Sequence, residues 1–185
     1  MRYIVAMATP RTPIRSIGII MDGNRRWASA RGLPSFAGHK AGFETLRKLS
    51  KETARLRETY GLEYVTLFAF STENWQRSAE EVSYLIDLFG LGLDEMLAAE
   101  AEDIRVRIVG QRERFSQSLQ EKFALLEEKT KDNIGTTVSF ALSYGGRTEI
   151  LNAAAAVAKS GEEMNEENVA KHLWTAGIPD PDILI

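Results

Sequence analysis

The sequence predicts an α/β fold, in which a mostly parallel β-sheet is flanked by helices. Short runs of β-branched and apolar residues alternate with helical stretches of ten or more residues along the chain. Parallel strands require crossover connections of about that length, whereas antiparallel strands are usually joined by tight turns. The chain has 185 residues and is 44% hydrophobic, which suits a single domain with its own core.

The chain opens on a buried strand followed by a helix. The apolar run at residues 16–21 has the length and composition of a strand that is covered on both faces. A helix is expected over residues 38–61, because Phe43, Leu46 and Leu49 recur at spacings of three.

A second strand and a long helix come next. Residues 63–70 are rich in aromatic and β-branched side chains and predict a strand that ends in a polar loop. A helix over residues 78–102 is expected to open with a capping box, in which Ser78 and Glu81 satisfy each other's backbone donors. Two glycines weaken the middle of this helix.

The remaining elements repeat the alternation of strand and helix. β-branched runs predict three more strands, and apolar periodicity predicts three more helices. The expected strands are residues 104–110, 136–142 and 182–185, and the expected helices are residues 116–131, 148–159 and 168–174.

Composition excludes several classes of protein. With 23 basic and 26 acidic side chains the formal charge is -3, which argues against a general nucleic-acid binder. The chain has no cysteine, so disulfides, zinc–thiolate sites and thiol nucleophiles are excluded. There is no apolar run of 18 residues and no signal-peptide pattern, so we expect a cytoplasmic protein without a transmembrane segment. Residues 1–15 are expected to be a flexible N-terminal segment and residues 16–185 a single domain.

Three polar clusters follow predicted strands at their carboxyl ends. They are residues 22–27 (DGNRRW), residues 71–77 (STENWQR) and residues 143–147 (SYGGR). Ligands of open α/β sheets bind outside the carboxyl ends of the strands. We therefore expect these clusters to meet at one edge of the sheet and to form a site.

The first cluster suits a phosphate group held with a metal ion. Asp22, Gly23 and Asn24 lie where a strand hands over to a helix, and a helix start offers free backbone N–H groups and a positive dipole end. Arg25 and Arg26 add forked donors that match phosphate oxygens. A carboxylate such as Asp22 is a suitable ligand for Mg²⁺, which commonly takes one or two carboxylates plus substrate phosphates.

Simpler interpretations of these residues remain open. Asp-Gly and Gly-Asn are turn dipeptides, and arginines commonly lie on surfaces. His39 near the start of a helix is often a cap or a surface group, and the glycines of residues 143–147 suit a tight turn. A P-loop, a complete GxGxxG motif, an HExxH zinc signature and a DDxxD cluster are all absent.

The polar clusters, taken together and in order, resemble the signatures of a known family. The segments IGIIMDGNRRWA, GHKAG, TLFAFSTENWQR and SYGGR are similar to the successive motifs of the cis-prenyltransferases, which include undecaprenyl diphosphate synthase. The resemblance runs from about Ile17 to the last residue. It implies an Mg²⁺-dependent, homodimeric transferase that condenses isopentenyl diphosphate with an allylic diphosphate, expected to be farnesyl diphosphate, and makes long-chain products such as undecaprenyl diphosphate. A product of that kind places the cytoplasmic enzyme peripherally at the inner face of the membrane.

The resemblance also implies roles for individual residues. Asp22 matches the catalytic aspartate that binds Mg²⁺, and Asn74 matches a residue assigned to proton abstraction. Because an amide is a poor base, we expect Asn74 to orient the isopentenyl group while diphosphate or water carries the proton. The remaining matches bind substrate: Gly23, Asn24, Arg25, Arg26, Trp27, His39, Ser71, Thr72, Glu73, Trp75 and Arg77.

The growing hydrocarbon needs an apolar sleeve. The second strand and the long helix, with Leu85, Leu88, Phe89 and Leu93, are candidates to line it, and a role as ordinary core is equally compatible with their sequence.

The chain departs from the family pattern at three places. Ser35 stands where the family usually has an arginine, and Ser143 stands where asparagine is usual. The family also continues with an Arg-Thr-x-Gly-Glu-x-Arg-x-Ser segment, so we expect residues 16–185 to be a catalytic domain truncated at its C-terminal end, of doubtful activity alone. A non-catalytic diphosphate-binding or partner subunit is the alternative function, and an unrelated phosphohydrolase has little support.

Overall fold

The computed structural model, which describes residues 14–99 and 104–185, contains one five-stranded sheet in the order β3-β4-β2-β1-β5. Every strand pairing in it is parallel, which confirms the predicted fold class. Of the expected flexible segment, residues 1–13 lie outside the described residues. The strands are β1 (Ser16–Ile20), β2 (Tyr64–Ser71), β3 (Ile104–Val109), β4 (Thr136–Tyr144) and β5 (Ile183–Leu184).

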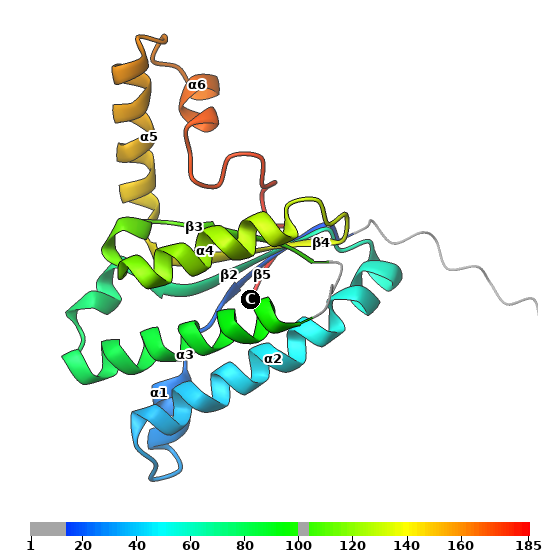
Figure 1. Ribbon diagram of the computed structural model, residues 1–185, viewed down its shortest axis with the longest axis vertical. Coiled ribbons are helices and arrows are strands. Elements are labelled where there is room, and N and C mark those ends of the chain that lie inside the picture. The colour runs from blue at the N-terminus through cyan, green and yellow to red at the C-terminus, as the bar shows by residue number, and fades with distance from the viewer. Residues whose placement is uncertain (1–13, 100–103) are drawn as a thin grey trace, which may run out of the picture.

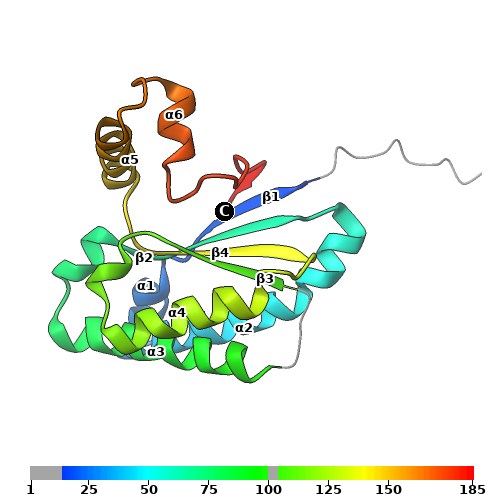
Figure 2. The ribbon, with the colours of Figure 1, turned by 45° about the horizontal axis from the view of Figure 1, so that its top comes forward.

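Helices cover both faces of the sheet. The helices between Asn24 and Thr130 lie on one side of the sheet, and the two C-terminal helices, α5 (Gly146–Ser160) and α6 (Glu166–Lys171), lie on the other side (Figures 1 and 2). Short 3₁₀ helices, η1 (Thr72–Gln76) and η2 (Arg112–Arg114), follow β2 and β3. The α-helices are α1 (Asn24–Ser29), α2 (Ser35–Tyr60), α3 (Ala79–Ala98), α4 (Gln117–Thr130), α5 (Gly146–Ser160) and α6 (Glu166–Lys171).

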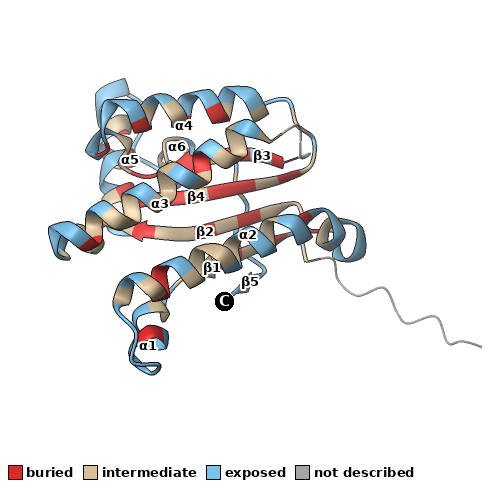
Figure 3. Ribbon diagram, turned by 60° about the horizontal axis from the view of Figure 1, so that its bottom comes forward, coloured by how far each residue is buried: buried red, intermediate tan, exposed pale blue. Residues whose placement is uncertain are grey.

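The hydrophobic core lies between the sheet and helices α2, α3 and α4. Alternate residues of the strands and the inner faces of the helices are buried there (Figure 3). Phe70 on β2, Val106 on β3 and Phe123 on α4 are among its fully buried side chains. The apolar faces that predicted these elements from the sequence therefore meet in one core.

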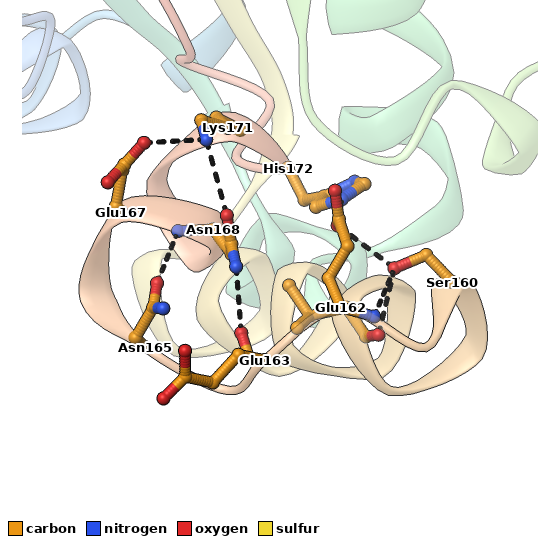
Figure 4. Close-up of polar contacts among 9 residues, drawn as sticks. Ser160, Glu162, Glu163, Asn165, Glu167, Asn168, Lys171 and His172 are labelled. Atoms are coloured by element: carbon orange, nitrogen blue, oxygen red, sulfur yellow. Dashed lines mark hydrogen bonds and ion pairs between the residues drawn. The ribbon is translucent and has the colours of Figure 1, made fainter.

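Three helices begin earlier than the sequence predicted, and one of them is α5, which starts at Gly146 rather than residue 148. Helix α2 starts at Ser35 rather than residue 38, because Pro34 sets the backbone just before the first turn. Helix α6 starts at Glu166 rather than residue 168, because the Asn165 side chain accepts the backbone N–H of Asn168 at 2.9 Å and caps the helix there (Figure 4).

The predicted capping box at the start of α3 is only half present. The Ser78 hydroxyl accepts the backbone N–H of Glu81 at 3.3 Å, as expected. The Glu81 carboxylate turns away from the helix start and contacts His39 and Arg77 instead. In place of the expected reciprocal pair, a full capping box forms around η1, between Ser71 and Asn74.

None of the helices in residues 14–99 and 104–185 combines the length and the hydrophobicity that crossing a bilayer requires.

Candidate active site

The chain leaves β1 through a tight turn that starts helix α1. Gly23 occupies the N-cap position with φ +84°, a left-handed conformation that glycine adopts without steric cost. Asp22, directly before it, is exposed, and its Oδ1 accepts a hydrogen bond from Arg26 at 2.9 Å. The turn therefore presents a carboxylate and the first backbone N–H groups of α1 at the carboxyl end of β1.

Helix α2 crosses this turn at very close range. A Cβ added to Gly38 would lie 2.0 Å from the backbone oxygen of Asn24, and one added to Gly42 would lie 2.6 Å from the Asn24 side chain. The two glycines, one helical turn apart, thus form the surface against which Asn24 packs. Only residues without a side chain allow the two helices to approach this closely.

The carboxyl end of β2 supplies the second part of the site. The backbone N–H of Ser71 donates to Asn74 Oδ1 at 3.0 Å, and the Ser71 side chain accepts the backbone N–H of Asn74. This reciprocal pair holds the 3₁₀ turn η1 against the strand end. It also commits the Asn74 carbonyl oxygen as an acceptor and orients the amide group.

The third polar cluster supports η1 from behind. The Trp75 indole donates from Nε1 to Ser143 Oγ at 2.9 Å, and its ring packs against Phe70 and Phe115 with centroid distances of 4.9 Å and 5.3 Å. Ser143 is fully buried at φ +49°, a conformation in which asparagine is favoured among non-glycine residues. Ser143 and Trp75 therefore fix the position of the turn that carries Asn74.

Three cationic or polar side chains gather around one buried carboxylate. His39 Nε2 and Arg77 Nη1 lie 3.0 Å and 2.9 Å from Glu81 Oε1, and Arg25 Nε lies 3.9 Å from the same oxygen. Burial of the Glu81 carboxyl raises its pKa, but the hydrogen bond from His39 and the charges of Arg77 and Arg25 together bring that pKa below its usual value. Glu81 is therefore ionised at neutral pH.

These elements enclose a pocket of about 760 Å³ at the carboxyl ends of β1 and β2, which we call the polar pocket. Within residues 14–99 and 104–185, Asp22 is the one acidic residue that lines the pocket, whereas three arginines line it. The pocket is therefore suited to an anion. Its polar lining residues are Asp22, Asn24, Arg25, Arg26, Ser29, Ser35, His39, Ser71, Asn74 and Arg77.

A mostly apolar cavity of about 300 Å³ lies beside the polar pocket on the core side. Phe43, Leu46 and Phe89 line both spaces and therefore lie where the two adjoin; we call these three residues the neck. Helices α2, α3 and α4 and the inner face of the sheet line the rest of the cavity. Its apolar lining includes Leu49, Val65, Leu67, Leu93, Met96, Ile104, Val106, Ile108, Leu126, Val138, Phe140 and Leu142.

The structure brings most of the predicted site residues into this pocket. Trp27 is exposed and carries the Arg31 guanidinium 4.3 Å above its ring, while Trp75 packs into the core side of η1. Glu73 is exposed, and Thr72 lies beside Gly145. These four residues do not line the polar pocket. Those that do are Asp22, Gly23, Asn24, Arg25, Arg26, His39, Ser71, Asn74 and Arg77.

Sequence reasoning missed two features of the site. The sequence predicts that Glu81 caps a helix, but its carboxylate lies behind the polar pocket. There it contacts His39 and Arg25, which are both far from it in the sequence. Gly38 and Gly42 were not considered, although a four-residue spacing of glycines early in a helix is a signal of close helix packing.

Comparisons with known proteins agree on one family. A sequence profile of the family described as "Putative undecaprenyl diphosphate synthase" matches residues 20–185. The isoprenyl transferase of Chromobacterium violaceum is 44% identical over 182 residues, covering 97% of this chain and 71% of that protein. The ditrans,polycis-undecaprenyl-diphosphate synthase of Vibrio cholerae, specific for (2E,6E)-farnesyl diphosphate, is 42% identical over 179 residues, covering 92% of this chain and 70% of that protein.

A solved structure shares the fold. Lavandulyl diphosphate synthase from Lavandula x intermedia, in complex with dimethylallyl diphosphate, superimposes with a TM-score of 0.82. It is 30% identical, and the match covers 94% of this chain and 76% of that one.

Proposed function

The chain belongs to the undecaprenyl diphosphate synthase family of prenyltransferases, and we propose that it condenses isopentenyl diphosphate with an allylic diphosphate to build a long-chain cis-polyprenyl diphosphate such as undecaprenyl diphosphate. Farnesyl diphosphate is the expected starter. The observation that supports this most strongly is that a cationic pocket and an apolar cavity lie side by side and share Phe43, Leu46 and Phe89 as lining residues. The pair of spaces matches a ligand with an anionic head and a hydrocarbon tail.

The diphosphate is assigned to the polar pocket. Arg25, Arg26 and Arg77 line it and offer charge-assisted hydrogen bonds to phosphate oxygens. The first N–H groups of α1 have no acceptor within the helix and add donors on the same side. Cleavage of the allylic C–O bond places negative charge on the departing diphosphate. Donors that already point at that charge lower the barrier, and each contributes roughly 3 kcal/mol in comparable sites.

We assign the Mg²⁺ ion to Asp22. Within residues 14–99 and 104–185, no three His, Cys, Asp or Glu side chains lie close enough to hold a metal without other ligands. This fits Mg²⁺, which is commonly bound through one or two carboxylates plus substrate phosphates. Mg²⁺ held at Asp22 together with a diphosphate would supply charge neutralisation at the leaving group. Asp22, exposed at the mouth of the pocket, is the acidic residue placed to ligate it.

Asn74 is proposed to orient the second substrate. Its Oδ1 accepts from the Ser71 backbone, so the amide NH₂ group is the part left to contact a ligand in the pocket. This supports an orienting role, with the proton passing to diphosphate or water. The hydrocarbon chain then extends past the neck, where Leu67, Phe89 and Leu93 line the apolar cavity.

The proposed function is tested by incubating the purified protein with farnesyl diphosphate, radiolabelled isopentenyl diphosphate and Mg²⁺. Labelled polyprenyl diphosphates with newly formed cis double bonds are expected in the organic extract. Binding of farnesyl diphosphate without any labelled product would instead support a non-catalytic diphosphate-binding subunit.

Introducing an arginine at position 35 is expected to strengthen allylic substrate binding. Ser35 lines the polar pocket in the first turn of α2, at the place where the resemblance predicts an arginine. One charge-assisted hydrogen bond to the diphosphate contributes about 1.5–3 kcal/mol, so the KM for farnesyl diphosphate should fall in Ser35→Arg. Lys40→Arg, on the exposed side of the same helix, is the control. An unchanged or higher KM in Ser35→Arg would mean that another residue already fills this role.

Removing Arg26 or Arg77 is expected to weaken diphosphate binding, and in Arg26→Ala this loss should exceed the loss of stability. Both residues line the polar pocket. The exposed Arg26–Asp22 ion pair contributes at most about 1 kcal/mol to folding, whereas Arg77 pairs with the buried Glu81, so Arg77→Ala should also lower stability. Calorimetric titration of Arg26→Ala and Arg77→Ala with a non-hydrolysable farnesyl diphosphate analogue measures the loss. Arg55→Ala breaks a similar surface pair with Glu52 and should leave the affinity unchanged. Wild-type affinity in both pocket variants would identify them as ordinary surface groups.

A homodimer is proposed from the resemblance to the family. The exposed apolar side chains of α5, Ile150 and Leu151 with 57% and 70% of their surface accessible, are compatible with a subunit contact on that side of the sheet. Sedimentation equilibrium is expected to give twice the monomer mass, and a single monomeric species would contradict the proposal. We further propose that the protein is cytoplasmic and works at the inner face of the membrane, into which its lipid product would partition.

A further inference from the structure

Glu81 is a buried residue, and the side chains that contact its carboxylate all line the polar pocket. Its side chain is 9% exposed, and that of its partner His39 is 4% exposed. Burying a charge is unfavourable unless partners compensate it. Here a single oxygen, Oε1, faces His39, Arg77 and Arg25, and these come from three separate parts of the chain: α2, the segment between η1 and α3, and α1.

Helix capping does not explain the position of this carboxylate. The cap of α3 is made by the Ser78 hydroxyl with the Glu81 backbone N–H, and any residue other than proline supplies that N–H at position 81. The Glu81 side chain takes no part in it. The charge at this position must therefore serve the three partners rather than the helix.

The contacts leave the outer donors of the arginines available. Arg77 reaches Glu81 through Nη1, and Arg25 approaches it through Nε. His39, Arg25 and Arg77 all line the polar pocket, whereas Glu81 does not. The carboxylate thus lies behind the three side chains, and these stand between it and any ligand in the pocket.

We propose that Glu81 is a positioning residue for diphosphate binding, which holds His39, Arg77 and Arg25 so that their remaining donors face the ligand. The proposal rests on the assignment of the diphosphate to the polar pocket. Donors that are fixed before the ligand arrives need no reorganisation when it binds or when charge develops on it. Without Glu81, both long arginine side chains lose their anchor on the inner side of the pocket.

A carboxylate near a diphosphate also repels it, and this effect has the opposite sign. If repulsion dominated, removing the charge of Glu81 would tighten diphosphate binding. Because the cations lie between Glu81 and the pocket, we expect positioning to dominate and binding to weaken. The direction of the change in affinity therefore decides between the two roles.

The experiment compares Glu81→Gln and Glu81→Leu in calorimetric titrations with a non-hydrolysable farnesyl diphosphate analogue. Gln keeps the volume and one acceptor oxygen, and Leu removes both the charge and the acceptor. The Kd is expected to rise moderately in Glu81→Gln and by about tenfold or more in Glu81→Leu. Glu127→Gln, which disrupts a comparable ion pair with Arg112 outside the pocket, is the matched control and should keep the wild-type Kd.

A double-mutant cycle with Arg77→Ala separates positioning from a general loss of stability. If Glu81 acts through Arg77, the effect of Glu81→Gln on the Kd should be smaller in the Arg77→Ala background. If Glu81→Leu does not fold, Glu81→Gln and its cycle decide the question. An unchanged or lower Kd in Glu81→Gln, or the same loss in both backgrounds, would overturn the proposal. A wild-type protein that fails to bind the analogue would instead contradict the assignment of the pocket itself.

Discussion

Replacing Asp22 with alanine is expected to abolish prenyl transfer while leaving the fold intact. Among the residues that the structure describes, Asp22 is the one acidic residue that lines the polar pocket, and the leaving diphosphate with its metal ion is assigned to this place. Loss of a group that stabilises charge in the transition state typically lowers kcat by about 10²–10³-fold, and loss of a metal ligand should have at least this effect. Radiolabelled isopentenyl diphosphate incorporation at saturating Mg²⁺ measures the change.

Stability provides the control for this variant. The Asp22 side chain is 73% exposed, and its ion pair with Arg26 contributes at most about 1 kcal/mol to the free energy of unfolding. Asp94→Ala breaks a similar exposed pair, with Lys122 at 2.7 Å, and should retain full activity. Equal turnover in wild type and Asp22→Ala would show that the metal diphosphate is not held by this carboxylate.

Gly38→Ala is expected to damage both the stability and the diphosphate site. The added Cβ would lie 2.0 Å from the Asn24 backbone oxygen and 3.1 Å from the Ala28 side chain, so α1 and α2 must move apart. Overpacking of this kind costs about 1–3 kcal/mol or more, because backbone rather than a flexible side chain has to shift. Urea unfolding measures the stability, and calorimetric titration with the farnesyl diphosphate analogue measures the site.

Gly90→Ala is the matched control, because it adds the same methyl group in the middle of another helix. No atom lies within 4 Å of the Cβ that would be added there. Replacing an unconstrained helical glycine with alanine usually stabilises a protein by about 0.5–1 kcal/mol. The two substitutions should therefore change the free energy of unfolding in opposite directions. A stabilised Gly38→Ala with wild-type affinity would contradict the proposed role of the close helix contact.

The strands were predictable because their signal is local. β-branched runs marked β1 to β4 closely, and the alternation with long helices indicated parallel pairing before any contact was known. The start of α2 was harder to predict. Residues 35–37 carry no apolar repeat, and only the proline before them indicates that a helix begins there.

The candidate site was predictable where one rule of topology applies. The carboxyl ends of neighbouring parallel strands meet at one edge, so Asp22 after β1 and Asn74 after β2 were expected to share a pocket. The contact of Glu81 with the site was not predicted, because a local pattern, the capping box, already accounted for this residue. Its partner His39 is 42 residues away, and no rule based on nearby residues detects such a contact. The size of the apolar cavity depends on the packing of three helices, which local patterns do not specify.

The long helix α2 links the two ends of the proposed ligand. At spacings of three or four residues, one of its faces presents His39 to the polar pocket, Phe43 and Leu46 to the neck, and Leu49 and Thr53 to the apolar cavity. From position 39 to 53 the helix rises about 21 Å, at about 1.5 Å per residue. A ligand that occupied both spaces would therefore contact one continuous helix from its anionic head to the end of its hydrocarbon tail.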